Sequence, residues 1–205
     1  MIVLIGGAPG VGKSVVASAL ARHLDILRLI DLDILRDILR LQSREREDPV
    51  LFMNALNAWE LHGSFSEKMV MDGFHAHIRQ QLGLTFRLID SYLASGKSAI
   101  LHGTALLPSQ TARYRNKDVH TFVIACTDEE AYRASFIELH KMRTGSTPRD
   151  IRIHAGWILH QNIVREAQDC GAQIIFGGIP PSGVHSLGRE FPGKVVEQIL
   201  GRLCS

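Results

Sequence analysis

The sequence predicts an α/β protein with a three-layer fold: a five-stranded parallel sheet, a helical insertion and an arginine-bearing lid. Short apolar runs alternate with longer segments of helical periodicity along most of the 205 residues. This alternation is typical of a parallel sheet that helices cover on both faces. Residues 50–95 show helical patterning alone and are too many for a simple crossover. We therefore expect residues 50–95 to form a helical flap over the sheet.

The start of the chain predicts two strand–helix units. Residues 1–5 are a continuous apolar run, as in a strand that is buried on both faces. A glycine-rich turn at 6–12 follows, and apolar residues then recur at helical spacing to about residue 23. Residues 26–30 are predicted to form the second strand, and a second helix is predicted to follow Asp33. The apolar face of this second helix would carry Ile34, Ile38 and Leu41.

A polar connection precedes the predicted flap. Residues 42–49 are mostly polar or charged, so we expect them to be exposed to solvent. Within the flap, Ser64 and Glu67 have the spacing of a capping box at the start of a helix. Glycine favours helix ends, so we expect helix breaks at Gly83 and Gly96.

The second half of the chain predicts three more strands, at residues 98–101, 119–125 and 173–176. Thr127 and Glu130 have the spacing of another capping box, which would begin a helix that ends near residue 140.

Two further helices complete the predicted fold. Thr147 and Pro148 indicate a helix start, because proline at the first helical position loses no needed hydrogen bond. We expect this helix to stop at Gly171. A glycine- and proline-rich loop at 177–193 would then lead to a last helix at 195–203.

The composition is that of an ordinary globular protein, with 45% hydrophobic and 21% charged residues. A formal net charge of +2 is too small to indicate a nucleic-acid or membrane partner. The three cysteines are widely spaced, so we expect neither a disulfide framework nor a paired-cysteine metal site. No run approaches the roughly 20 apolar residues that cross a bilayer, and the first residues lack a basic leader. We expect one domain over residues 1–205, in the cytoplasm.

The segment GGAPGVGKS contains the phosphate-loop pattern GxxxxGKS between Gly7 and Ser14. Glycines allow successive backbone N–H groups to curl around a phosphate, and the following helix directs its positive end at the same anion. The apolar strand before it and the helix after it are the context in which this pattern binds nucleotides. We expect the nucleotide to contact Gly7, Ala8, Pro9, Gly10, Val11, Gly12, Lys13, Ser14 and Val15.

The side chains of this loop predict the cofactors ATP and Mg²⁺. Lys13 can reach the β- and γ-phosphates, and the Ser14 hydroxyl can bind the metal. The guanine-reading pattern NKxD is not evident, which favours ATP over GTP. We expect the base to pack on the loop at 177–183.

A carboxylate and a guanidinium follow the second predicted strand. Ligands bind at the carboxyl ends of strands in open α/β sheets, so Asp33 would face the γ-phosphate and act as a catalytic residue. It can orient or deprotonate an acceptor hydroxyl, while Arg36 binds an anionic group of the acceptor. The alternative is that aspartate only caps the helix, which is an attractive explanation of Asp31. We also expect acceptor contacts from Arg40 and, at the end of the third strand, from His102.

A basic segment at residues 141–150 predicts a lid. Arginines in this segment could close over the transferred phosphoryl group and neutralise its charge. The planar guanidinium suits phosphate oxygens, but a solvated turn between two helices would also be basic. We expect the lid arginines to be Arg143, Arg149 and Arg152, with Arg149 as a catalytic residue.

The histidines give a weaker signal. His75 and His77 would point apart on a helix, so a metal site there is not expected. Phosphoryl transfer often uses an acidic residue near the position of His102 to hold Mg²⁺, and histidine supplies no negative charge. The metal would then depend on Ser14, the nucleotide and Asp33.

Several segments in order resemble the 2-phosphoglycerate kinase family. They are GGAPGVGKS, LDILRDILR, SAILHGTALLP, FVIACTDEEAYRASF and PRDIRIHAGWILHQNIVREAQDCGAQII, and they extend over most of residues 1–176. The resemblance implies a P-loop kinase-type fold and transfer of the γ-phosphate of ATP, with Mg²⁺, to a small acidic acceptor. By position it implies that ATP and metal are held by Lys13 and Ser14, the acceptor by Asp33 and Arg36, and the lid by Arg149 and Arg152.

Two departures from the family pattern limit this comparison. The family has an acidic residue where this chain has His102, which affects metal handling and substrate identity. Family members often carry an N-terminal regulatory region, whereas this sequence begins at the first strand.

The leading hypothesis is an ATP-dependent kinase that acts on a polar, anionic small molecule such as a hydroxy acid or a phosphorylated metabolite. A nucleoside, nucleotide or antibiotic kinase is an alternative, as is a nucleotide-binding regulatory protein with little turnover. In each enzyme reading the flap at 50–95 would shape the acceptor pocket. No nucleic-acid or membrane partner is expected, and a homodimer through the flap is left open.

Overall fold

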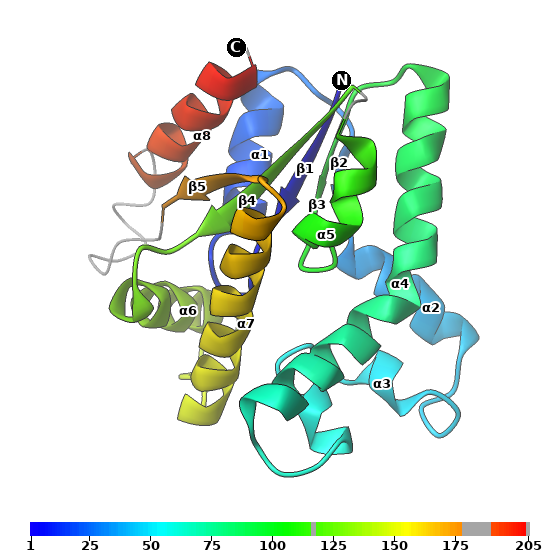
Figure 1. Cartoon of the computed structure of the whole chain (residues 1–205), viewed down its shortest axis with the longest axis vertical. Helices are drawn as coiled ribbons and strands as arrows, with labels where there is room; N and C mark the ends of the chain where they lie inside the picture. Colours follow the sequence, from blue (N-terminus) through cyan, green and yellow to red (C-terminus); the bar gives the residue numbers. More distant parts are fainter. Residues whose placement is uncertain (116–117, 178–189, 204–205) are drawn as a thin grey trace.

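A computed structural model describes residues 1–115, 118–177 and 190–203 of the chain, and shows a twisted sheet between helices (Figure 1). The five strands are β1 (Ile2–Gly6), β2 (Leu29–Asp31), β3 (Ala99–His102), β4 (Val119–Ala125) and β5 (Gln173–Phe176). They lie in the order β2-β3-β1-β4-β5, and every pairing is parallel. The predicted fold class is confirmed.

Helices cover both faces of this sheet. They are α1 (Lys13–His23), α2 (Asp33–Gln42), α3 (Pro49–Phe52), the 3₁₀ helix η1 (Ala58–Leu61), α4 (Glu67–Ser95), α5 (Pro108–Thr111), the 3₁₀ helix η2 (Ala112–Tyr114), α6 (Glu129–Thr144), α7 (Asp150–Asp169) and α8 (Glu190–Leu203). In the described part of the chain, no helix is both long enough and apolar enough to cross a bilayer.

The central strand β1 is buried on both faces, as its apolar run predicts. Val3 and Ile5 belong to the larger apolar cluster, which includes residues of α1, α7 and α8. Ile2 and Leu4 belong to a second cluster, which includes residues of α4 and η2. Side chains alternate along a strand, so β1 contributes residues to both apolar clusters. This packing fixes the strand from which the following loop begins.

Three predicted helix starts are shifted in the structure. The side chain that caps α4 is Ser66, whose Oγ accepts the Met69 N–H at 3.3 Å, and not Ser64. The side chain that caps α6 is Asp128, which accepts the Ala131 N–H at 2.8 Å, and not Thr127. Aspartate is the better cap, and it lies next to the first helical residue. Pro148 precedes Arg149, the residue before α7, and so lies outside that helix.

Other boundaries also differ from the prediction. β2 covers Leu29–Asp31 and so begins later than expected, because Ile26 is buried ahead of the strand as part of the larger core. Helix α6 extends to Thr144, where Gly145 ends it in the left-handed conformation with φ of 68°. The apolar face predicted for α2 does not enter the core, and no residue of α2 is fully buried.

The predicted break at Gly83 is wrong, because α4 is continuous from Glu67 to Ser95. The helix changes direction part of the way along its length (Figure 1). A glycine inside a helix costs only about 1 kcal/mol, which the packing of both halves of α4 offsets. The predicted break at Gly96 is confirmed, since this residue ends the helix with φ of 64°.

The two interior glycines of α4 should respond oppositely to alanine. A Cβ on Gly73 would lie 2.4 Å from the Trp59 backbone nitrogen in η1, so Gly73→Ala should destabilise the fold by about 1–3 kcal/mol. A Cβ on Gly83 meets nothing within 4 Å, so Gly83→Ala should stabilise it by about 0.5–1 kcal/mol. Urea unfolding midpoints measure both changes. A shift of the same sign in both variants would contradict the close approach of α4 and η1.

Candidate active site

The loop between β1 and α1 has the backbone conformation that its glycines allow. Gly7, Gly10 and Gly12 have φ of 134°, 88° and 91°, values that strain other residues. A Cβ on Gly7 would also lie 2.5 Å from the carbonyl oxygen of Ile124 on β4. The loop ends at the N-terminus of α1, which begins at Lys13. This combination of backbone turn and helix end is suited to binding phosphate.

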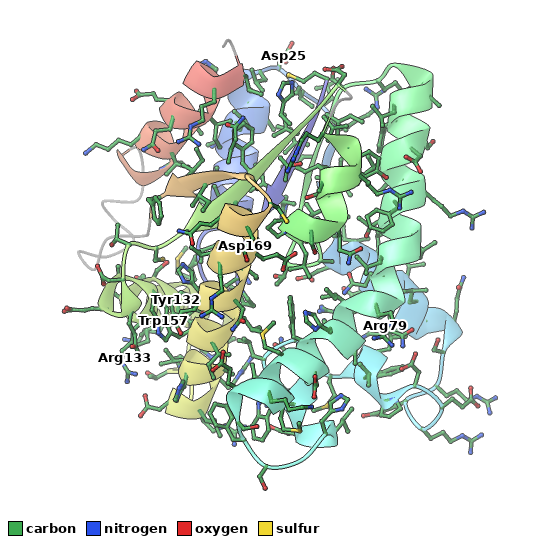
Figure 2. All side chains as sticks on the ribbon, in the orientation of Figure 1. Asp25, Arg79, Tyr132, Arg133, Trp157 and Asp169 are labelled. Atoms are coloured by element: carbon green, nitrogen blue, oxygen red, sulfur yellow. The ribbon has the colours of Figure 1, made fainter. Side chains whose placement is uncertain are left out.

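Two hydroxyl groups of α6 donate hydrogen bonds to backbone carbonyl oxygens of the loop. Tyr132 Oη donates a hydrogen bond to the Pro9 carbonyl oxygen at 2.7 Å, and Ser135 Oγ donates one to the Gly10 carbonyl oxygen at 2.7 Å. Burial raises the pKa of Tyr132 well above its ordinary value, so its hydroxyl stays protonated. The Tyr132 ring packs against Trp157 where α6 and α7 face each other (Figure 2). Helix α6 therefore sets the shape of the loop.

Removing the Tyr132 hydroxyl should weaken nucleotide binding. Tyr132→Phe leaves the Pro9 carbonyl oxygen without its donor, and we expect the Kd for ATP to rise roughly 3- to 10-fold. Tyr114→Phe is the matched control, because this buried hydroxyl bonds the Phe86 carbonyl oxygen at 3.3 Å on another part of the fold. Calorimetric titration measures both. Equal loss of ATP affinity in the two variants would contradict a specific role of Tyr132.

A cavity of about 160 Å³ opens beside the loop. Its walls come from the loop itself, the ends of β2 and β3, α2, the segment before η1, α4, α6 and α7. The carboxyl ends of parallel strands thus meet segments of the helical flap, as expected for a ligand site in an open α/β sheet. We expected the base to pack on the loop 177–183, of which residues 178–183 lie outside the residues that the structure describes.

Asp31, Asp33 and His102 meet at the ends of neighbouring strands. Asp31 pairs in register with His102, and its Oδ1 lies 3.9 Å from His102 Nδ1. The same carboxylate accepts the Asp33 N–H at 3.0 Å, but the residue at the N-cap position of α2 is Leu32 and not Asp31. Burial lowers the pKa of His102, with Asp31 opposing the shift, so the ring carries little positive charge at neutral pH. All three residues line the cavity.

Three arginines line the same cavity: Arg36, Arg143 and Arg152. The Arg36 side chain is only 14% exposed and lies 3.5 Å from Asp33 Oδ1. Among the described residues, the buried Nε atoms of Arg36 and Arg152 have no hydrogen-bond partner. Arg143 Nη2 donates to Ser14 Oγ at 3.4 Å. The cavity therefore presents guanidinium groups with hydrogen-bond donors that could serve an anion.

Two predicted arginines lie outside this wall. Arg40 donates hydrogen bonds to the carbonyl oxygens of Leu51, Phe52 and Met53 at 2.8 to 3.3 Å, at the end of α3. Its guanidinium does not line the cavity. Arg149 is 72% exposed, lies 4.0 Å from Glu60 and is likewise absent from the cavity wall. In the predicted lid, residues 141–144 belong to α6.

Lys13 is the first residue of α1, and its side chain folds back onto the loop. Its Nζ donates a hydrogen bond to the Ala8 carbonyl oxygen at 2.8 Å. Burial lowers the pKa of Lys13 from 10.5 to about 8, while Asp33 acts in the opposite direction. Below about pH 7 the ammonium is charged, and a bound phosphate would favour the charged form.

ATP affinity should therefore fall as the pH rises. A bound triphosphate raises the pKa of Lys13 above its value of about 8 in the free protein, so binding requires a proton above that pH. We expect the Kd for ATP to be about tenfold higher at pH 9 than at pH 7. Lys13→Met should bind weakly and without this change. An unchanged Kd for the natural protein over this range would contradict the pKa.

The residues present fit a magnesium ion held chiefly by the nucleotide. Among the described residues, no group of three histidine, cysteine or acidic side chains could hold a metal ion. Ser14 Oγ and the carboxylates of Asp31 and Asp33 share the cavity beside the loop. Mg²⁺ commonly takes one or two protein oxygens together with phosphate oxygens and waters. This donor set suits that arrangement.

Several cavity residues were not predicted from the sequence: Asn54, His77, Gln81, Thr104 and His140. His77 and Gln81 are buried on α4, on the side of the helix that also carries Phe74 and Ile78. Polar residues on an otherwise apolar helix face were the available signal.

Curated proteins similar to this chain are small-molecule kinases. No protein-family model matches the chain. It is 32% identical over 143 residues to a 2-phosphoglycerate kinase of Methanocaldococcus jannaschii, covering 70% of this chain and 44% of that protein. It is 27% identical over 133 residues to a mevalonate-3-phosphate 5-kinase of Thermoplasma acidophilum, covering 65% of each. The chain spans about half the length of the curated 2-phosphoglycerate kinases that it matches.

A solved structure supports the fold. The shikimate kinase from Acinetobacter baumannii in complex with shikimate superposes with a TM-score of 0.52, over 99% of this chain and 92% of that chain, at 15% identity. At this identity the likeness concerns the P-loop kinase fold alone.

Proposed function

We propose that this chain, which is similar to 2-phosphoglycerate kinases, transfers the γ-phosphate of ATP to the hydroxyl group of a small anionic acceptor. One observation carries the proposal. The cavity that begins at the phosphate loop continues directly to Asp33 and Arg36. A carboxylate and a guanidinium next to the γ-phosphate position are the groups that an anionic alcohol would need.

In the proposed reaction the loop and Lys13 hold the β- and γ-phosphates. Asp33 accepts the proton of the acceptor hydroxyl, whose oxygen forms a bond to the γ-phosphorus. The bond between that phosphorus and the β–γ bridging oxygen breaks, and ADP leaves. Ser14, with Asp31 or Asp33 nearby, would hold Mg²⁺, which neutralises phosphate charge when bound.

The arginines take two roles in this proposal. Arg36 and Arg152, with their unpartnered Nε atoms, bind the anionic group of the acceptor. Arg143 already reaches Ser14 and neutralises charge that develops on the transferred group. Arg149 precedes α7, is 72% exposed and does not line the cavity, so a role in transfer would require residues 145–149 to move.

A nucleotide-binding regulatory protein with little turnover is the second candidate. His102 favours it, because a buried and largely neutral imidazole stands where the family pattern has an acidic residue. The two candidates share the nucleotide site and differ in the use of the acceptor half of the cavity.

An acceptor-dependent ADP assay separates these functions. The purified protein is mixed with ATP, Mg²⁺ and a panel of hydroxy acids, phosphorylated alcohols, nucleosides and aminoglycosides. ADP release that requires an anionic hydroxy compound, and that disappears in Lys13→Ala, would support the proposal. Turnover confined to nucleosides or aminoglycosides would replace it with another kinase activity. Tight ATP binding without stimulation by any acceptor would favour the regulatory protein.

A further inference from the structure

Helix α4 contributes two polar, uncharged side chains to the cavity wall, His77 and Gln81. Gln81 and His77 are each 3% exposed and lie one helical turn apart, so they share a face of α4. Both side chains line the cavity. Within the described residues, the buried His77 Nδ1 has no hydrogen-bond partner.

Such groups are unusual inside a folded protein. A buried polar group without a partner costs about 1–3 kcal/mol, so nearly all are satisfied by protein, water or ligand. Here His77 Nδ1 and the Nε atoms of Arg36 and Arg152 lie in the wall of one cavity, which the Gln81 side chain also lines. Three of the six buried atoms without partners in the described residues thus lie at this cavity, which indicates a ligand that completes their hydrogen bonds.

The chemistry of the two side chains limits what that ligand group can be. Burial is the main cause that lowers the pKa of His77 to about 4, so the imidazole is neutral at pH 7. The ring bonds the Val50 backbone, and a neutral ring that donates through its other nitrogen leaves Nδ1 as an acceptor. A carboxylate or phosphate dianion has no proton to donate to Nδ1. A hydroxyl group can donate to His77 and accept from the Gln81 amide.

His77 lies close enough to Arg36 and Asp33 for their charges to act on it. We infer that the acceptor is an anionic polyol with at least two hydroxyl groups. One hydroxyl receives the phosphoryl group at Asp33, a second donates to His77 Nδ1 and accepts from Gln81, and Arg36 and Arg152 bind the anionic group. This inference rests on the proposed kinase function and defines the class of its acceptor.

Two pairs of probes test for the second hydroxyl. Glycerate is compared with 3-hydroxypropanoate, and glycerol 3-phosphate with 3-hydroxypropyl phosphate, since the members of each pair differ by one hydroxyl. Calorimetry measures binding without ATP, and coupled ADP release measures kcat/KM. We expect the dihydroxy member of at least one pair to be preferred roughly 10- to 100-fold in both measurements.

Neighbouring residues of α4 supply matched controls. Gln81→Met keeps the side-chain length and removes the amide, whereas Gln80→Met makes the same change at an exposed position. His77→Phe and the exposed His75→Phe form a second pair. The preference should fall toward 1 in Gln81→Met and His77→Phe, and should remain in both controls. A retained preference in Gln81→Met and His77→Phe with normal unfolding midpoints would overturn the assignment of these residues.

The failures of the two proposals are distinguishable. Equal kcat/KM for both members of each pair would overturn the second-hydroxyl site while the kinase function stands. Selective binding of a dihydroxy anion without any ADP release would support the site and overturn the kinase function. Absence of both binding and turnover with all four probes would overturn the acceptor class.

Discussion

Asp33→Asn is expected to lower kcat for phosphoryl transfer by about 10²- to 10⁴-fold, the range of a lost general base. Asparagine has nearly the same shape as aspartate but accepts no proton at neutral pH. Asp33 lies at the start of α2, lines the cavity and faces Lys13, on which its charge acts. The Kd for ATP should change much less than kcat, because the phosphate loop itself is untouched. Single-turnover kinetics and calorimetry measure the two quantities separately.

Asp37→Asn is the matched control for this variant. Asp37 lies on the same helix, is within 3.2 Å of Arg40 and 3.9 Å of Arg36, and does not line the cavity. We expect its kcat to stay within about threefold of the natural protein, as for a partly exposed ion pair. If Asp33→Asn turned over as fast as this control, Asp33 would not be the base.

Lys13→Met is expected to reduce kcat/KM by about 10²- to 10³-fold or more, through both kcat and KM. The ammonium is the charged side chain within the phosphate loop, and it would contact phosphate oxygens before and during transfer. Methionine fills the same space without the charge. Steady-state kinetics over a range of ATP concentrations give both parameters.

Lys68→Met provides the comparison for Lys13→Met, since Lys68 is an exposed partner of Asp72 on α4. Its kinetics should match those of the natural protein. A Lys13→Met enzyme with a raised KM but a normal kcat would show that Lys13 binds ATP without stabilising the transition state.

The part of the site that local sequence determines could be predicted. The phosphate loop is a contiguous pattern between a buried strand and a helix, and Gly7, Gly10 and Gly12 have the backbone conformations that the pattern requires. Asp33 and Arg36 were predicted because ligands bind at the carboxyl ends of the strands in an open parallel sheet, and both residues follow such an end, that of β2.

The rest depends on how distant segments meet. Arg40 and Arg36 lie one turn apart on α2, yet only the first is taken up by the carbonyl oxygens of α3, and that contact depends on how residues 43–48 fold back. Likewise, His77 and Gln81 join the site only because α4 crosses the open end of the sheet. No spacing within α4 specifies that crossing.

The predicted lid at residues 141–150 likewise depends on where α6 ends, which the sequence did not predict correctly. The position of Gly145 in the left-handed conformation makes residues 141–144 the end of α6, so Arg143 projects from a helix and not from a loop. Arg149 and Arg152 are separated by the start of α7, and only the second is carried into the cavity. Sequence spacing alone could not distinguish them.

The two hydroxyl contacts and Arg143 belong to one helix, α6, with Tyr132 and Ser135 against the loop and Arg143 at its last turn. A change in the position of α6 would therefore move its contacts with the loop and the Arg143 guanidinium together. Because Arg143 contacts Ser14 in this structure, the helix that contacts the loop also keeps a guanidinium beside it.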